Sequence, residues 1–157
     1  DAGVREIVDE SAEFSTNESM GQSGDRLAAA FGISRREQDE FAVRSHKLAD
    51  EATKKGYLTD VVPVFVPNEK EPVSRDLGIR VSTLEQVSKL KPAFFKQYGT
   101  VTAANASFLT DGGSACLNTT EEKAKQLGLK PKAYLRNFTY VAQDPKDQLL
   151  LGCSPTL

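Results

Sequence analysis

The chain has 157 residues, of which 39% are hydrophobic and 27% charged, and its formal net charge is −2. This composition excludes intrinsic disorder, collagen-like repeats and disulfide scaffolds, and the length suits one ordinary domain. Balanced, scattered charges argue against a nucleic-acid partner. Two cysteines without a Cys-x-x-Cys motif, beside a single histidine, cannot assemble a standard zinc site, so we expect a reduced intracellular protein without a metal.

The first 18 residues carry few large apolar side chains and resemble neither a signal peptide nor an Arg-rich transit peptide. We expect a lead-in segment here, formed by a short helix or a mobile stretch. The chain begins with Asp1 instead of Met, which fits a fragment or a processed product. No apolar run approaches the ~20 residues that span a bilayer.

Apolar spacing and end signals predict two helices. The first covers about residues 22–31 and ends at Gly32, because glycine tolerates the left-handed conformation of a helix end. The second follows a Ser-x-x-Glu capping box at residues 34–37 and ends near Lys55, with Gly56 as its stop. Its apolar stripe has the spacing of one helix face. The stripe consists of Phe41, Ala42, Ser45, Leu48, Ala49 and Ala52.

Pro63 and Pro92 limit the secondary structure that the middle of the chain can form. Residues 61–66 favour a strand but contain Pro63, which predicts an edge strand because proline cannot donate to a ladder. Residues 68–78 are charged and are expected to form a loop. Residues 84–90 predict a short helix that ends before Pro92.

The last third combines strand and helix signals. Strands are expected at residues 100–104, 114–118 and 132–142, the last because of its aromatic residues. A Thr-x-x-Glu capping box at residues 119–122 predicts a helix that Gly128 closes. This order of strand, helix and strand is typical of a βαβ unit with a parallel pair.

Several stretches together resemble the thiolase family. Met20-Gly21 and the run GISRREQDEFAVRSH at residues 32–46 are similar to the opening of the thiolase loop domain. KLKPAF at residues 89–94 and GTVTAANAS at residues 99–107 resemble the return from that domain to the core. Within the family, three further stretches are similar to the beta subunit of the mitochondrial trifunctional enzyme. They are SFLT at residues 107–110, KPKAYLR at residues 130–136 and QDPKDQLLLG at residues 143–152.

The resemblance implies an incomplete α/β thiolase fold. Residues 1–18 would be the lead-in segment, and residues 19–98 the helical loop domain that covers coenzyme A. Residues 99–152 would form a partial core of strand, helix and strand, followed by a non-matching tail at residues 153–157.

The activity that the resemblance implies is that of a 3-ketoacyl-CoA thiolase (acetyl-CoA C-acyltransferase) in fatty-acid β-oxidation. Its substrates are CoA and 3-ketoacyl-CoA, and it needs no cofactor. The implied partners are the remainder of the thiolase chain, the trifunctional enzyme alpha subunit and further copies in an oligomer. The implied location is the mitochondrial matrix or inner membrane.

Catalysis in this family uses a cysteine thiolate, a histidine that activates it and a second cysteine. Cys116 and Cys153 match no catalytic position, and no Gly-His-Pro motif is present. His46 lies off the apolar stripe and is expected to be exposed or half-buried. We therefore expect no catalytic residue here and no thiolysis by the isolated chain. An alternative hypothesis is a truncated, non-catalytic module that binds CoA or a partner subunit.

Binding residues are carried over from the family by position. Ser107, in the Asn-Ala-Ser turn, would approach the pantetheine; Met20 would lie beside the substrate pocket; Arg80 would approach the nucleotide end. Gln86 stands where many thiolases have a second CoA-contacting serine. Judged without the family, Ser107 is a turn residue that bonds its own backbone, and Met20 fills a core.

Overall fold

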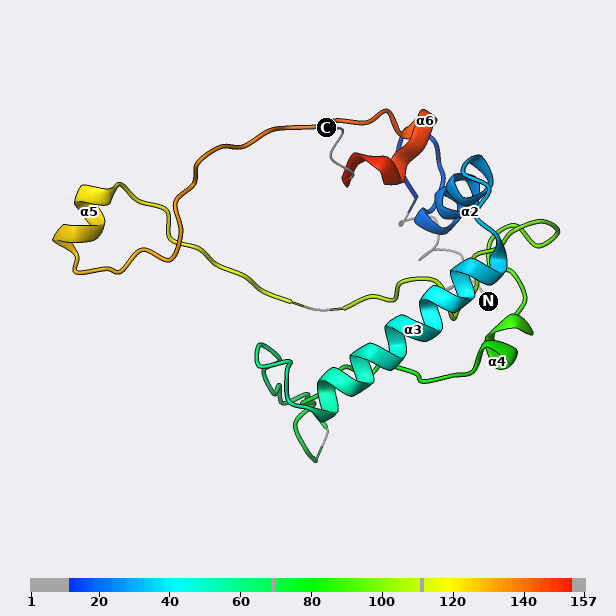
Figure 1. Cartoon of the computed structure of the whole chain (residues 1–157), viewed down its shortest axis with the longest axis horizontal. Coiled ribbons are helices and arrows are strands. Elements are labelled where there is room, and N and C mark those ends of the chain that lie inside the picture. Colours follow the sequence, from blue (N-terminus) through cyan, green and yellow to red (C-terminus); the bar gives the residue numbers. More distant parts are fainter. Residues whose placement is uncertain (1–11, 69, 111, 154–157) are drawn as a thin grey trace.

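The computed structural model describes residues 12–68, 70–110 and 112–153 (Figure 1). Most of the predicted lead-in segment and the tail at residues 154–157 lie outside these residues. The helices in the described ranges are α2 (Met20–Ala30), α3 (Arg35–Lys54), α4 (Leu84–Ser88), α5 (Glu121–Gln126), α6 (Pro145–Gln148) and the 3₁₀-helix η1 (Leu149–Cys153). None of them is long and apolar enough to cross a membrane.

Helix α3 confirms the capping box that the sequence predicts. The hydroxyl of Ser34 accepts a hydrogen bond from the Glu37 amide at 3.2 Å, and the Glu37 carboxylate accepts one from the Ser34 amide at 2.8 Å. Gly32 and Gly56, just beyond α2 and α3, have φ angles of 65° and 68°. Both glycines therefore adopt the left-handed conformation that ends a helix.

Helix α5 begins one residue later than the capping box predicts. Thr120 is the N-cap, and its hydroxyl accepts a hydrogen bond from the Lys123 amide at 3.2 Å. Thr119 and Thr120 offer the same hydroxyl, so the sequence does not decide between them, and the glutamate that the pattern needs at the third helical position is Lys123 instead. Gly128 closes the helix as predicted, with a φ angle of 66°.

The predicted strands are wrong within the described ranges. Their only β pairing is an isolated antiparallel bridge between Val64 and Val73, with hydrogen bonds of 3.0 and 2.9 Å. Residues 112–120 and 129–143 run as extended arms that carry α5 far from the other helices (Figure 1). A strand needs a neighbour that completes its hydrogen bonds, and β-propensity reports only a fit to a pleated surface. The predicted βαβ unit is therefore not formed.

Polar contacts hold the helical part together more than apolar ones do. The buried hydrophobic residues among those described are Ala42, Val87 and Ala124, whereas Thr102, Asp39 and Ser23 are at most 1% exposed. Helix α3 packs on α4, and α2 packs on η1 (Figure 1). The chain thus places its most deeply buried side chains where they make hydrogen bonds, as buried polar groups require.

A carboxylate-centred turn precedes α2 and predicts a pH effect. One carboxylate oxygen of Glu13 accepts hydrogen bonds from the amide and hydroxyl of Ser15 at 2.8 and 2.7 Å, and from those of Thr16 at 2.8 and 3.0 Å. The bonds from Ser15, followed by those from Thr16, lower the pKa of Glu13 from 4.5 to about 2. Because the pKa is lower in the folded turn, its stabilisation is present above the unfolded pKa and is lost as the pH falls through about 2.

We expect Ser15→Ala to raise the pKa of Glu13 more than Thr16→Ala does, because the hydroxyl of Ser15 makes the largest contribution. An NMR titration of the Glu13 side-chain carboxyl carbon measures both changes. An unchanged titration midpoint in Ser15→Ala would contradict the role given to this hydroxyl.

Candidate functional site

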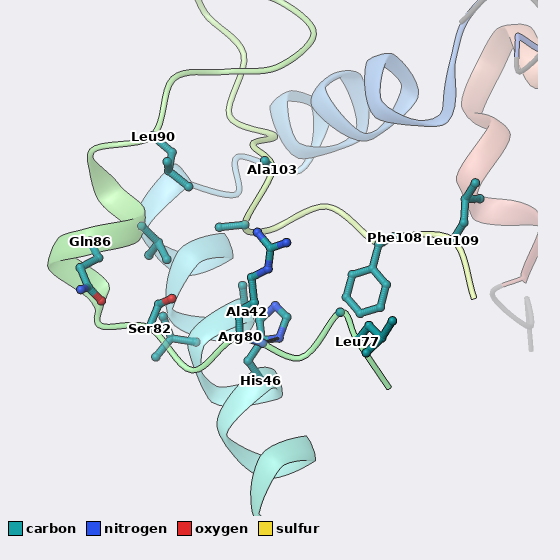
Figure 2. Close-up of a pocket in the computed structure, with 14 residues that line it drawn as sticks. Ala42, His46, Leu77, Arg80, Ser82, Gln86, Leu90, Ala103, Phe108 and Leu109 are labelled. Carbon is teal, nitrogen blue, oxygen red and sulfur yellow. Dashed lines mark hydrogen bonds between the residues drawn. The ribbon is translucent and has the colours of Figure 1, made fainter. Parts of the chain in front are cut away.

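Two adjoining cavities lie between α3, residues 76–90 and the turn at residues 103–109. Figure 2 shows the residues that line the larger one. The larger has a volume of ≈ 580 Å³ and the smaller one of ≈ 370 Å³. Four residues line both of them: Ala42, His46, Ala104 and Phe108. The larger volume is typical of small-molecule sites.

Helices α3 and α4 form two of the walls. Ala42 and His46 are four residues apart on α3 and therefore project from the same face of the helix. Helix α4 adds Gln86 and Val87 to the larger cavity (Figure 2). The two helices are joined by Arg35, whose guanidinium donates to the carbonyl oxygen of Val87 at 2.8 Å and to that of Leu90 at 3.1 Å.

The larger cavity has mainly apolar walls and one cationic side chain in its lining. Arg80 is the only formally charged residue among those that line it, and Ser82, Gln86 and His46 supply further polar atoms. A guanidinium suits a phosphate or carboxylate, and apolar walls suit an uncharged chain. The described residues contain no group of three or more His, Cys, Asp or Glu side chains that could hold a metal ion.

The structure brings two of the three predicted binding residues into one region. Arg80 lines the larger cavity and Ser107 lines the smaller one. Ser107 is exposed, and its hydroxyl donates to the carbonyl oxygen of Phe108 at 3.4 Å, a local turn contact. Met20 lines neither cavity; it begins α2 and is 58% exposed, so it is not core filler.

Two further polar residues, Ser19 next to Met20 and Gln86 in the wall of the larger cavity, cap helices. The hydroxyl of Ser19, next to Met20, accepts a hydrogen bond from the Gln22 amide at 3.4 Å. Gln86 lines the larger cavity, and its side-chain oxygen accepts a hydrogen bond from the Thr83 amide at 2.9 Å. Ser19 and Gln86 therefore each stabilise a helix start.

A buried carboxylate fixes the turn that carries Ser107. Asp39 accepts hydrogen bonds from the Arg35 guanidinium at 2.8 Å and from the Asn105 side-chain amide at 3.1 Å. The same amide donates to the Thr100 carbonyl oxygen at 3.0 Å, while the Asn105 side-chain oxygen accepts from the Thr102 amide at 2.7 Å. The sequence does not reveal this network, because an Arg and an Asp four residues apart usually form a surface pair.

His46 is half-buried, as expected, but its place in the site was missed. Its Nδ1 accepts a hydrogen bond from the Arg80 backbone amide at 3.2 Å. Its ring stacks on Phe108 with a centroid separation of 6.3 Å and an interplanar angle of 19°. The four-residue spacing from Ala42 was the available signal, since it puts both side chains on one helix face.

The cysteines do not join this region in the described structure. Cys116 is exposed on an extended arm and lines neither cavity. The side chain of Cys153 lies outside what the structure describes. Thiolase chemistry needs a cysteine beside an imidazole, and Cys116 does not join the cavities that His46 lines.

The fold and these motifs define a class of protein. Residues 2–122 match the family described as thiolase, N-terminal domain. Because this match covers more than half of the 157 residues, the chain belongs to the thiolase family.

Particular thiolases are similar to the chain at high identity. It is 70% identical over 142 residues to the probable 3-ketoacyl-CoA thiolase of Caenorhabditis elegans, covering 90% of this chain and 32% of that protein. It is 67% identical over 141 residues to the mitochondrial trifunctional enzyme subunit beta of Homo sapiens, covering 90% and 30%. The chain thus spans about a third of the length of these relatives.

Solved structures show the same family likeness. The crystal structure of the acetyl-CoA acetyltransferase of Bacillus anthracis superposes with a TM-score of 0.68 at 39% identity, covering 80% of this chain and 33% of that one. The acetyl-CoA acetyltransferase of Syntrophomonas wolfei gives a TM-score of 0.58 at 35% identity, covering 72% and 29%. These structures cover most of the chain, although its described residues form no strand.

Proposed function

We propose that this chain is a portion of a 3-ketoacyl-CoA thiolase of fatty-acid β-oxidation and that it supplies part of the CoA-binding surface. The observation that carries the proposal is that Arg80 and Ser107, 27 positions apart in the sequence, line two adjoining cavities that share part of their walls. Identities of 67–70% to a trifunctional enzyme beta subunit and a probable 3-ketoacyl-CoA thiolase support the choice of family member.

Each predicted residue has a role that its chemistry supports. The guanidinium of Arg80 would bind a phosphate at the nucleotide end of CoA. The hydroxyl of Ser107, exposed at the smaller cavity, would hydrogen-bond an amide of the pantetheine. Met20, exposed at the start of α2, would contact the acyl part of the substrate.

Thiolysis itself would use residues that these 157 positions do not contain, since no Gly-His-Pro motif occurs and neither Cys116 nor Cys153 matches a catalytic position of the family. The chain alone would bind CoA without turnover and without a cofactor. Residues 19–98 would act as the loop domain, while the extended arms in residues 99–152 would pair with strands of the remaining thiolase chain. The mitochondrial trifunctional enzyme beta subunits among the relatives support a mitochondrial location and association with other subunits. Within this proposal, the alpha subunit is the partner, and the location is the matrix or inner membrane.

Titration calorimetry of the purified chain with CoA tests the proposal. We expect Arg80→Ala to weaken CoA binding by about tenfold, because a charge-assisted contact is lost. Ser107→Ala should weaken it by about threefold, because one neutral hydrogen bond is lost. Arg36→Ala and Ser88→Ala are matched controls at exposed positions that line neither cavity.

Two results would count against this function. The first is the absence of CoA binding by the unaltered chain at millimolar concentration. The second is an equal loss of affinity in the cavity variants and in their exposed controls.

A further inference from the structure

The ring of Phe108 lies between α3 and the segment of residues 76–82. On one side it stacks on His46, with a centroid separation of 6.3 Å. The ring also lies against Gly78, where an added Cβ would overlap the Phe108 ring, so a larger residue at position 78 would require the ring to move. Figure 2 shows Phe108 facing the region of His46 and Leu77.

The same histidine holds the backbone of this segment. Nδ1 of His46 accepts the Arg80 amide at 3.2 Å, which requires an imidazole with its proton on Nε2. Among the described residues, this is the only hydrogen bond between the backbone of residues 74–82 and a helix. The bond from the Gly78 amide to Asp76 stays within the segment. The position of Arg80 therefore depends on His46.

We propose that His46 and Phe108 form a clamp that sets the spacing between Arg80 and Ser107. Phe108 is the neighbour of Ser107 in the chain, and Arg80 is bonded to the ring on which Phe108 stacks. One imidazole thus fixes both halves of the site. Neither clamp residue has to touch the ligand: they are positioning residues, and the inference rests on the proposed CoA-binding function.

A clamp of this kind raises the affinity for a long ligand more than the affinity for fragments of that ligand. A ligand that contacts Arg80 and Ser107 together gains affinity when their spacing is already set, because less order must be created on binding. A fragment that contacts only one of them gains little. Loss of the clamp should therefore weaken CoA more than it weakens pantetheine or adenosine 3′,5′-bisphosphate.

The test compares His46→Ala, His46→Asn and Phe108→Leu, with Arg44→Ala as the control on the exposed face of α3. Asparagine places an acceptor oxygen near the position of Nδ1, so it should restore the bond to Arg80 without the stacked ring. Amide exchange at Arg80 in the ligand-free chain reads the clamp directly. His46 is the single histidine, so its imidazole signals are assigned without ambiguity.

We expect His46→Ala to abolish the protection of the Arg80 amide and to weaken CoA binding by about tenfold. The affinity of each fragment should fall by less than about threefold, and His46→Asn should recover most of the amide protection. Phe108→Leu should shift the imidazole signals of His46 and weaken CoA binding. Arg44→Ala should change none of these readouts.

Unchanged Arg80 protection in His46→Ala would overturn the clamp, as would equal losses for CoA and for both fragments. If the unaltered chain does not bind CoA, the proposed function fails, and the exchange and imidazole measurements still decide whether the clamp exists.

Discussion

Replacing Asp39 by alanine is expected to lower the free energy of unfolding by about 3 kcal/mol. The Asp39 side chain is 1% exposed and is paired with Arg35, whose side chain is 23% exposed. Removal of Asp39 takes the carboxylate away from the half-buried Arg35 guanidinium and from the Asn105 amide, which keep only their bonds to backbone carbonyl oxygens. This loss costs more than that of a surface pair. Because the Arg35 side chain keeps some contact with water, we place the loss at the lower end for buried pairs.

Urea unfolding followed by circular dichroism at the helix band measures this loss. Glu40→Ala is the matched control, because Glu40 sits next to Asp39 and pairs with Arg36 at side-chain exposures of 49% and 78%. Its effect should stay within about 0.5 kcal/mol. Asp39→Asn keeps an acceptor for Asn105 and should be milder than Asp39→Ala. Equal effects of Asp39→Ala and Glu40→Ala would show that the buried pair is not a structural centre.

Asp25→Ala is expected to lower the free energy of unfolding by about 2 kcal/mol. One carboxylate oxygen of Asp25 accepts the amides of Thr100 and Val101 at 2.6 and 2.8 Å, and the residue is 6% exposed. Alanine would leave both amides without an acceptor. Helix α2 would then lose its attachment to the segment that leads into the Asn-Ala-Ser turn.

Amide exchange of Thr100 and Val101 separates this effect from a general loss of helix. We expect faster exchange at both amides in Asp25→Ala, and a smaller change in Asp25→Asn, which retains an oxygen. Asp50→Ala removes the partner of Lys54, whose side chain is 73% exposed, and serves as the control, with an effect of about 0.5 kcal/mol or less. Unaltered exchange at Thr100 and Val101 in Asp25→Ala would refute the assigned attachment.

Helices α2 to α5 could be predicted from the sequence because their signals are local, whereas α6 and η1 were not predicted. The Ser34 and Glu37 pair, the apolar spacing and the glycines at positions 32 and 56 all act within a few residues of the helix that they define. The predicted strands at residues 114–118 and 132–142 failed for the opposite reason. The aromatic and β-branched side chains of residues 132–142 favour a sheet, but the partner strand that completes a sheet is encoded in neither segment.

The candidate site likewise combines residues that could be predicted with long-range contacts that could not. Arg80 and Ser107 were placed by resemblance to a family, and the residues alone offered only an exposed arginine and a turn serine. Their meeting depends on Asp39 and on the stacked His46 and Phe108, which are contacts across 62 or more positions of sequence. No local pattern separates an Asp buried by such a network from one on the solvent face of a helix.

The small number of buried hydrophobic residues affects how the stability of the chain changes with temperature. Unfolding would bring little additional apolar surface into contact with water, because the buried hydrophobic residues in the described ranges are Ala42, Val87 and Ala124. The heat capacity of the chain should therefore rise only slightly on unfolding, and its stability curve should be broad and flat. Cohesion would come chiefly from the enthalpy of carboxylate and amide bonds.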